Sequence, residues 1–344
     1  MSDARPRVSV IVPVRNEERY VGGCLSRLLG QDYPGELLEI LVVDCLSEDR
    51  TRAIVEELMR GHAPMPPVLR MIDDPGRERT TALNAGIRAA AGEIIMRVDA
   101  RSMVPLDYVR KCVETLAATG ADNVGGMQQP IAVSPMQEAV GLAMSHPFGV
   151  GDAQFRVGKK SGFVDTVYLG AFRREVFSRV GLFDDVVPVL AEDSDINQRI
   201  RNHGGTVYLN AEIRACYYPR ETLRDLVALY FRYGVARAGN LVKHRKLSAW
   251  RQAVPPLFVL SLATLGLLAV THEGSRVGFA IVLGVYVISD VGVSAFLCAR
   301  RGKWHLWPRL FAVFPCMHFA WAFGLFNGLL AGFDRKVLRR APPS

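Results

Sequence analysis

Cysteine is scarce in this chain, and its pattern predicts neither a disulfide framework nor a cysteine-bound metal. None of the six cysteines stands in C-x-x-C spacing, and two of them lie in long apolar runs. We therefore expect reduced thiols that pack as small apolar side chains. The six are Cys24, Cys45, Cys112, Cys216, Cys298 and Cys316.

Acidic residues are outnumbered, yet nothing in the sequence directs the basic excess toward nucleic acid. The chain has 42 Lys and Arg against 34 Asp and Glu, which gives a formal net charge of +8. No zinc-finger or RNA-binding signature accompanies these charges, so nucleic acid is not an expected partner. The basic residues crowd the stretch 220–251 and the gaps between apolar runs, which favours anionic lipid or phosphorylated substrates.

The first 252 residues lack both a signal peptide and a long apolar run. The first apolar run, Val8–Val14, is too short for a signal sequence and is followed at once by Arg15, Glu17 and Glu18. We therefore expect this part of the chain to remain in the cytoplasm.

Long apolar runs do occur farther along the chain. Residues 253–270, 277–299 and 310–333 form three of them, each near or above the length of about 18 residues that a membrane helix needs. The third run carries glycines at four-residue spacing (324, 328 and 332), which is typical of a helix-packing seam. The basic tail after residue 333 argues against placing the carboxyl end outside, so the number of full spans stays at two to three.

These patterns predict three regions. Residues 1–219 form a cytoplasmic α/β domain, residues 220–251 form basic amphipathic helices at the membrane interface, and residues 252–344 form the transmembrane region. The expected location is a bacterial-type cytoplasmic (inner) membrane, with the first domain facing the cytoplasm.

Within the first region, short apolar strands alternate with helical patterns. Val8–Val14, Glu39–Asp44 and Glu93–Asp99 read as buried strands, which predicts a mostly parallel sheet. Ligands of such sheets bind beyond the carboxyl ends of the strands. Asp44 and Asp99 stand at two of these ends, and Glu17 follows the first strand, so we expect an acidic rim where a ligand sits.

Five motifs in this order carry a family resemblance. Over roughly residues 7 to 245 the chain resembles the family 2 glycosyltransferases, which have the GT-A (Rossmann-like) fold. The membrane tail and the stretch 92–100 are most similar to succinoglycan-type (ExoA-like) membrane glucosyltransferases. The five motifs are Ile11–Glu17, Val42–Asp49, Arg79–Gly86, Val98–Arg101 and Ala191–Asp195.

The resemblance implies a set of donor-binding residues. Pro13, Arg15 and Glu17 would line the nucleotide pocket. Asp44 would accept hydrogen bonds from a uracil-type base, and Asn84 would lie near the ribose or the diphosphate.

The family's DxD motif is altered here. Asp99 is its first acid and would hold Mg²⁺ or Mn²⁺ against the donor diphosphate. The third position is Arg101, whose guanidinium cannot ligate a metal. Three interpretations stay open: Asp99 holds the metal with diphosphate oxygens and water, Arg101 itself pairs with the diphosphate, or Arg101 points away and pairs with a surface acid.

The segment Glu192–Asp195 places acids at the start of a predicted helix. Inverting sugar transfer needs a base for the acceptor hydroxyl, and adjacent carboxylates raise each other's pKa. The resemblance makes Asp193 that base and Glu192 a supporting or acceptor-binding residue. The alternative is an acid-rich helix start that the helix dipole stabilises.

The acceptor side is predicted from two further stretches. Asp165, Tyr168 and Gly170 lie where the family lines its acceptor pocket, although a core strand is an alternative interpretation. Arg232 and Tyr233 lie in the nearest match to the family's Q-x-x-R-W motif, where Arg232 would meet a phosphate and Tyr233 would stack on a sugar. The Gln and Trp are absent, which favours addition of one sugar per encounter.

Together these features predict an inverting glycosyltransferase. It would move a sugar from a UDP-linked donor to a polyprenyl-diphosphate-linked saccharide in exopolysaccharide or cell-envelope glycan synthesis. The alternatives are a polyprenyl-phosphate sugar synthase and a non-catalytic membrane scaffold that keeps only the fold. The sequence leaves the sugar, the linkage and the oligomeric state open.

Overall fold

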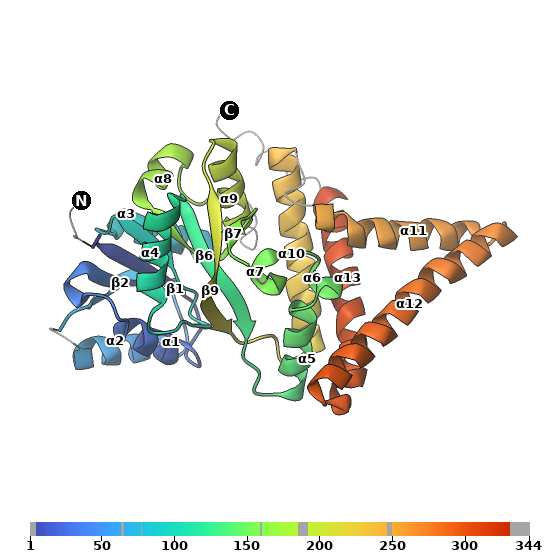
Figure 1. Cartoon of the computed structure of the whole chain (residues 1–344), viewed down its shortest axis with the longest axis horizontal. Helices are drawn as coiled ribbons and strands as arrows, with labels where there is room; N and C mark the ends of the chain where they lie inside the picture. Colours follow the sequence, from blue (N-terminus) through green and yellow to red (C-terminus); the bar gives the residue numbers. More distant parts are fainter. Residues whose placement is uncertain are drawn as a thin grey trace. The chain divides into compact units, whose positions relative to one another are not determined.

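The computed structural model describes residues 5–62, 65–76, 78–158, 160–184, 192–245 and 250–330. These residues divide into two compact units (Figure 1). The first unit combines 1–129 with 154–218, and the second combines 130–153 with 219–344. The segment 130–153, which was predicted to belong to the first domain, therefore packs within the second unit. Ala191, residues 246–249 and the end of the third apolar run lie outside the described residues.

The first four strands of the first unit form the parallel part of a sheet. Strand β1 (Val8–Val14) pairs in parallel with β2 (Leu38–Asp44) on one side and β4 (Ile94–Arg97) on the other. Strand β3 (Val68–Asp73), which was not predicted, extends the sheet beyond β2. The β-branched run of β1 is buried along its whole length because both faces of this central strand are covered.

The remaining strands make the sheet mixed, so the predicted parallel order holds only for β1 to β4. The sheet order among the described residues is β3-β2-β1-β4-β8-β6-β9-β5, with β7 paired to β9. Strand β8 is antiparallel to both β4 and β6, and β9 is antiparallel to β5 and β7. The bounds are Ser102–Met103 for β5, Asn123–Pro130 for β6, Gly162–Phe163 for β7, Tyr168–Arg173 for β8 and Val207–Tyr217 for β9.

Helices cover both faces of this sheet and form two cores. One core joins alternate β1 residues to buried positions of α1, α2 and α4, and the other joins Ile11 to buried positions of α3, α8 and α9. This alternation fixes the register of β1, since a one-residue slip would exchange the two faces. The bounds are Val21–Leu29 for α1, Thr51–His62 for α2, Arg79–Ala89 for α3, Tyr108–Thr119 for α4, Gln154–Val157 for α7, Arg174–Val180 for α8 and Glu192–Asn202 for α9, with a 3-10 turn at Gly35–Leu37.

The described part of the second unit is helical. Three of its segments are long and apolar enough to cross a membrane, and they coincide closely with the three predicted apolar runs: Trp250–Leu268, Glu273–Arg301 and Trp304–Leu330. The bounds are Pro135–Met144 for α5, Pro147–Val150 for α6, Leu223–His244 for α10, Val254–Leu268 for α11, Glu273–Arg301 for α12 and Trp307–Leu330 for α13, with 3-10 turns at Trp250–Gln252 and Trp304–Leu306.

Helices α10 and α13 pack closely at glycines. A Cβ atom placed on Gly324 would lie 2.0 Å from the carbonyl oxygen of Phe231, and one placed on Gly234 would lie 2.1 Å from that of Trp321. Gly328 meets Ala238 in the same contact. Two glycines of the predicted seam therefore face α10, while residue 332 lies outside the described residues.

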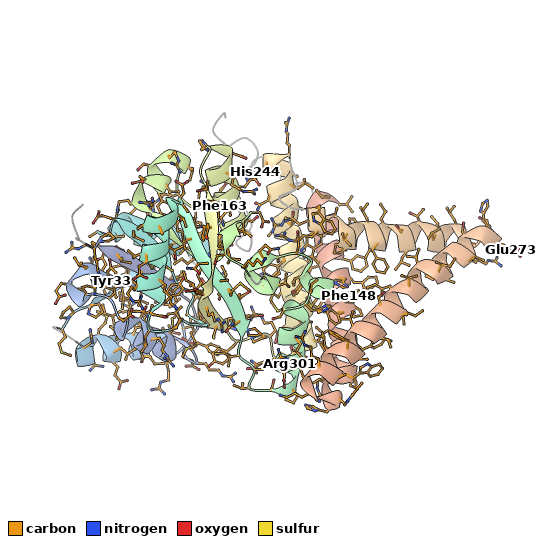
Figure 2. All side chains as sticks on the ribbon, viewed as in Figure 1. Tyr33, Phe148, Phe163, His244, Glu273 and Arg301 are labelled. Atoms are coloured by element: carbon orange, nitrogen blue, oxygen red, sulfur yellow. The ribbon has the colours of Figure 1, made fainter. Side chains whose placement is uncertain are left out.

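Helix α12 presents an apolar surface along its length. Figure 2 shows Glu273 and Arg301 at its two ends. Between them Ile281, Val285 and Ile288 are exposed, as expected for side chains that face lipid tails. Within the stretch 220–251, which was predicted to form helices at the membrane interface, residues Leu223–His244 form the helix α10, which packs on α13.

Candidate active site

Arg97, the last residue of β4, is buried beside the carboxyl ends of the parallel strands. All four residues of β4, which lies between β1 and β8, are buried. The Arg97 side chain is only 3% exposed. A buried guanidinium requires carboxylate partners, since an unpaired charge in the interior costs several kcal/mol.

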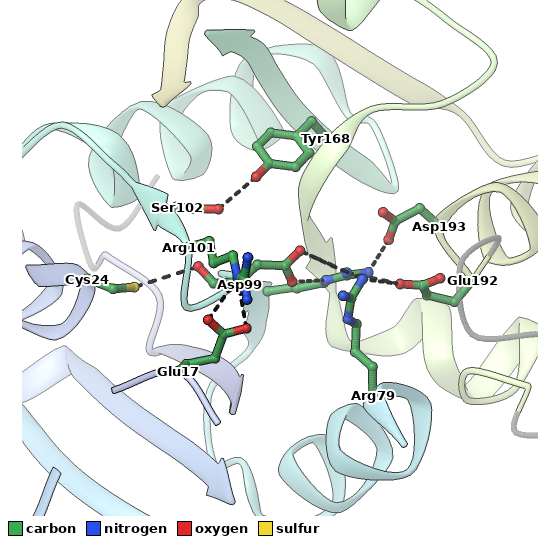
Figure 3. Close-up of polar contacts among 10 residues, drawn as sticks. Glu17, Cys24, Arg79, Asp99, Arg101, Ser102, Tyr168, Glu192 and Asp193 are labelled. Atoms are coloured by element: carbon green, nitrogen blue, oxygen red, sulfur yellow. Dashed lines mark hydrogen bonds and ion pairs between the residues drawn. The ribbon is translucent and has the colours of Figure 1, made fainter. Parts of the chain in front are cut away.

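Three carboxylates meet this guanidinium (Figure 3). Asp99 accepts from Arg97 Nε at 2.8 Å and from Nη2 at 3.1 Å, in a bidentate pair. Asp193 Oδ1 lies 2.5 Å from Nη1, and Glu192 Oε1 lies 3.0 Å from Nη2. The acid of the DxD motif and the two acids that begin α9 are therefore brought together by one side chain.

Arg79, the first residue of α3, adds a second guanidinium to this cluster. Its Nη1 lies 3.1 Å from Glu192 Oε1 and 4.0 Å from Asp99 Oδ2. Burial would raise the pKa of Asp99, but Arg97 and Arg79 outweigh it and hold that pKa below its usual range. Two guanidinium groups face three carboxylates, so this group of five carries one negative charge in excess when all are ionised.

The surroundings of Asp193 favour its protonated form. Burial raises the pKa of Asp193 to about 7; Arg97 opposes this rise, and Glu192 and Asp99 reinforce it. A third of its side chain (33%) is exposed, unlike the Glu192 side chain at 4%. Among the described residues only Arg97 Nη1 contacts it, through Oδ1, so Oδ2 is available to a substrate. A carboxylate with a pKa near neutrality and one open oxygen suits a general base.

Glu17 and Arg101 form the other side of the site. Arg101 Nε lies 3.0 and 2.8 Å from the two carboxylate oxygens of Glu17. The guanidinium also lies over the ring of Tyr20, 5.1 Å from its centre, and Tyr20 packs against Tyr218. Arg101 therefore pairs with an acid, but that acid is itself a predicted donor-binding residue. The Arg101 side chain is 41% exposed, and both of its hydrogen bonds to Glu17 are made by Nε.

The predicted acceptor residues of the first unit differ in their surroundings. Tyr168 begins β8, and its hydroxyl shares a 2.7 Å hydrogen bond with Ser102 Oγ beside Asp99 (Figure 3). Asp165 is half-buried just before that strand. Gly170 is buried in the sheet with φ of +80°, and a Cβ there would lie 2.6 Å from the ring of Phe172. The glycine is therefore required by the backbone and the core.

Two further predicted donor residues, Asp44 and Asn84, form polar contacts within the protein. Asp44 is buried at the end of β2, accepts from the Ser47 amide at 3.2 Å and lies 3.6 Å from Arg52. Asn84 donates to the Phe183 carbonyl at 2.8 Å and accepts from the Phe183 amide at 2.9 Å, so both ends of its amide are used within the protein.

Four further predicted residues are not among the described side chains that meet Arg97. Pro13 is buried within β1, and Arg15 is exposed just after that strand. Arg232 and Tyr233 lie on α10 of the second unit, where Arg232 is exposed and the Tyr233 ring packs edge-on against Tyr230 at 5.6 Å. The roles assigned to them remain predictions.

The side chains of this site can bind a divalent cation only if the substrate supplies some of its ligands. Among the described residues, no three His, Cys, Asp or Glu side chains are arranged to hold a metal. Asp99 uses one lone pair on each oxygen for Arg97, so each oxygen retains another. Magnesium binds through one or two carboxylates when substrate phosphates and water complete its shell. The residues therefore fit a cation that is held jointly by Asp99 and a diphosphate.

Sequence reasoning missed Arg97 and gave no role to Arg79 or Tyr20. The signal for Arg97 was present, because an arginine interrupts the apolar run Ile94–Val98 of a strand with two covered faces. Such a residue must carry partners into the core. Tyr20 had no comparable signal, since a tyrosine at helical spacing reads as a core position.

The sequence of this chain is similar to those of known sugar-transfer proteins. A sequence profile of Glycosyl transferase family 2 matches residues 9–181. The succinoglycan biosynthesis protein ExoA of Rhizobium meliloti is 29% identical over 95% of this chain and 96% of its own length. A dolichyl N-acetyl-α-D-glucosaminyl phosphate 3-β-D-2,3-diacetamido-2,3-dideoxy-β-D-glucuronosyltransferase of Methanococcus voltae is 25% identical over 94% of this chain and 98% of its own.

The fold is also similar to a solved structure. The mannosyltransferase PcManGT of Pyrobaculum calidifontis, in complex with GDP-Man and Mn²⁺, matches with a TM-score of 0.65 and 22% sequence identity. The match covers 96% of this chain and 89% of that protein. The likeness therefore extends over both the sheet unit and the helical unit.

Proposed function

The chain belongs to glycosyltransferase family 2 and has the GT-A fold that its sequence predicted, and from this premise we propose the reaction that it catalyses. The enzyme transfers a sugar from a UDP-linked donor to a polyprenyl-diphosphate-linked saccharide, with inversion at the anomeric carbon. The product serves exopolysaccharide or cell-envelope glycan assembly. The observation that carries the proposal is the convergence of Asp99 and Asp193 on one buried arginine.

Asp193 is the general base of this proposal. Its Oδ2 takes the proton of the acceptor hydroxyl while the acceptor oxygen attacks the anomeric carbon. The bond from that carbon to the donor diphosphate breaks in the same step, and the nucleoside diphosphate leaves with the bonding electrons. Arg97 holds Oδ1 at 2.5 Å, so the carboxylate keeps a fixed orientation during the transfer.

Glu192 supports the base rather than meeting the acceptor. Its side chain is buried, and Oε1 is shared by Arg79 at 3.1 Å and Arg97 at 3.0 Å. Its negative charge lies next to Asp193 and favours a raised pKa there. Of its two predicted roles, burial therefore favours the supporting one.

The donor diphosphate lies between Asp99 and Arg101. Asp99 would hold Mg²⁺ or Mn²⁺ together with diphosphate oxygens, and such a cation would neutralise charge on the leaving group. The Nη groups of Arg101 face the same diphosphate, while Nε stays on Glu17. Pro13, Arg15 and Asp44 belong to the nucleotide end of this pocket by family resemblance. The Mn²⁺ named with the Pyrobaculum mannosyltransferase supports a divalent cation.

The acceptor is lipid-linked in this proposal because the chain has three candidate membrane helices. The name of the Methanococcus relative includes a dolichyl-linked amino sugar, which supports a saccharide on a polyprenyl carrier. The second unit also has an open apolar groove of about 390 Å³, which is lined by side chains of α6, α11 and α12 and suits a hydrocarbon chain. The basic side chains of α10 suit the carrier's phosphates, and a cytoplasmic orientation at the inner membrane follows from the nucleotide-sugar supply.

The test is a panel of donors and acceptors. Purified enzyme in nanodiscs is incubated with radiolabelled UDP- and GDP-sugars and with either polyprenyl phosphate or a polyprenyl-diphosphate disaccharide. The proposal expects label on the disaccharide lipid from a UDP-sugar. Label on bare polyprenyl phosphate would identify a polyprenyl-phosphate sugar synthase instead. Transfer only from GDP-sugars would overturn the proposal that the donor carries a uracil base.

A further inference from the structure

The three candidate membrane helices of the second unit differ in how much of their surface the protein itself covers. In the most apolar stretch of Trp304–Leu330, 44% of the residues are buried, against 22% in each of the other two segments. Figure 1 shows α11 and α12 meeting at a tip that extends away from α13, and Figure 2 places Glu273 at this tip. The surroundings of α13 therefore have to be considered separately.

Helix α10 runs alongside α13 in the same direction and in a fixed register. A Cβ atom on Gly324 would lie 2.0 Å from the Phe231 carbonyl oxygen, and one on Gly328 would lie 3.0 Å from that of Val235. The interval between the contacting residues is the same in both pairs, so the two helices advance together. Because these contacts are made to the backbone, α13 cannot enter a bilayer without taking α10 with it.

This register brings charged residues of α10 to the middle of α13. The middle residue of Trp304–Leu330 is Met317, which lies at the level of Arg224 when the register is continued. Arg224 and Asp225 are exposed, and so is Arg232, about 12 Å farther along α10. The half-thickness of the hydrocarbon core is about 15 Å. If α13 crossed the bilayer, all three exposed charges would therefore lie in hydrocarbon, where such charges are costly.

Helices α11 and α12 have no such obstacle. Helix α11 has no charged residue, and it exposes Leu257 and Leu260. Between Arg276 and Arg300, α12 has one acid, Asp290, which is only 1% exposed. The stretch between these two arginines is about 36 Å long, which is enough to cross the core. Charge is thus confined to the two ends of α12 and to its protein-covered side.

We propose that the chain crosses the membrane twice, with α11 and α12 as a hairpin in the hydrocarbon core, and that α13 lies beside α10 at the cytoplasmic surface. The turn between α11 and α12 is then outside, and both ends of α13 are on the same side of the bilayer. Two crossings agree with the basic tail after residue 333, since positive charge favours the cytoplasmic side. The choice of the cytoplasm for that side rests on the proposed function, whereas the number of crossings does not.

The experiment labels single added cysteines in the full-length protein with a membrane-impermeant maleimide, in intact and in permeabilised spheroplasts. Gly274→Cys probes the tip of the hairpin, His305→Cys the start of the third segment and Leu330→Cys its end; all three positions are exposed. The wild type is the control, and four of its six cysteines are buried. We expect Gly274→Cys to react in intact spheroplasts, and His305→Cys and Leu330→Cys to react at least ten times more strongly after permeabilisation.

Reaction of Leu330→Cys in intact spheroplasts, with His305→Cys still protected, would show that α13 crosses the membrane and would overturn the inference. Reaction of Gly274→Cys and His305→Cys from the same side would overturn it as well. If the sides of all three are reversed, the two crossings stand and the cytoplasmic orientation of the proposed function fails.

A second measurement decides the case if Leu330→Cys reacts from neither side. Green fluorescent protein or alkaline phosphatase is attached after residue 344 of the wild-type chain, since the first fluoresces only in the cytoplasm and the second is active only outside. Two crossings predict fluorescence without phosphatase activity, and phosphatase activity without fluorescence would overturn the inference.

Discussion

The buried residue Arg97 contributes to the stability of the fold as well as orienting the acids of the site. Two charges gain little by being buried together, but removing one partner leaves the other uncompensated. Arg97→Met should therefore lower the free energy of unfolding by about 3 kcal/mol or more. Chemical denaturation of the protein in detergent, followed by tryptophan fluorescence, measures this loss. Arg110→Met, on an exposed ion pair, should change it by less than about 1 kcal/mol. Equal effects of the two substitutions would contradict the placement of Arg97.

The pH dependence of the reaction reports on Asp193. The pKa of this carboxyl is raised to about 7 by burial, and only its ionised form accepts a proton. As pH falls through 7 the base becomes protonated, so kcat/KM should fall about tenfold per pH unit below that point and level off above it. A rate that stays constant from pH 8 to pH 5.5 would contradict the assignment. Surface carboxylates cannot produce this limb, because their ordinary pKa values lie near 4.

The acids of the site could be predicted from their motifs, because strand ends and helix starts are visible in a sequence. Asp99, Glu192 and Asp193 lie together in the structure. Their common partner could not be placed in advance, since the pairing of Arg97 with α9 spans about a hundred residues. Asn84 was predicted from its motif to lie near the donor, but its side-chain amide forms two hydrogen bonds with the backbone of Phe183. A sequence motif does not reveal such a contact within the protein.

Strand β8 makes a distinct prediction about Gly170. An alanine there requires an unfavourable left-handed backbone and contacts the Phe172 ring at 2.6 Å. Gly170→Ala should therefore lower the melting temperature while the folded fraction keeps its KM for the acceptor. Gly120→Ala separates the two causes, since its φ is +67° but no atom lies within 4 Å, which leaves only a backbone cost of roughly 1–2 kcal/mol. A raised acceptor KM with normal stability would favour a direct role in binding.

The contact of α10 with α13 depends on glycine. Gly324→Ala places a methyl group 2.0 Å from the Phe231 carbonyl, so the helices must separate, at a cost of about 1–3 kcal/mol. Thermal unfolding in detergent micelles measures the effect. Gly284→Ala on α12 is the matched control, because its added methyl meets no atom within 4 Å, and helix propensity alone should make it neutral or slightly stabilising. Equal stability of the two variants would show that this packing is not maintained in solution.

At the level of elements, local patterns predicted well and distant pairings did not. The apolar runs of β1 and β2 and the three long apolar helices follow from composition over a short window. The antiparallel strands depend on contacts such as Ser102 with Tyr217, which no local pattern specifies. The predicted mostly parallel sheet was therefore right for one half and wrong for the other.

The whole molecule combines a sheet unit that carries the carboxylate cluster with a helical unit that carries the candidate membrane spans. Segment 130–153 joins the helical unit although it lies between two stretches of the sheet unit in sequence. The chain therefore crosses between the units at three places, which opposes independent folding of either. This connectivity suits an enzyme whose donor is soluble and whose acceptor is held in a bilayer.

The central claim is that Asp193 is the general base in the transfer of a sugar to a lipid-linked acceptor. The direct measurement compares wild type, Asp193→Asn and the surface control Asp32→Asn for transfer of radiolabelled sugar into the lipid fraction, with donor binding measured by calorimetry on the same preparations. We predict that Asp193→Asn loses transfer by a factor of about 10² to 10⁴ while it still binds the donor, and that Asp32→Asn keeps both. Undiminished transfer by Asp193→Asn would contradict the account.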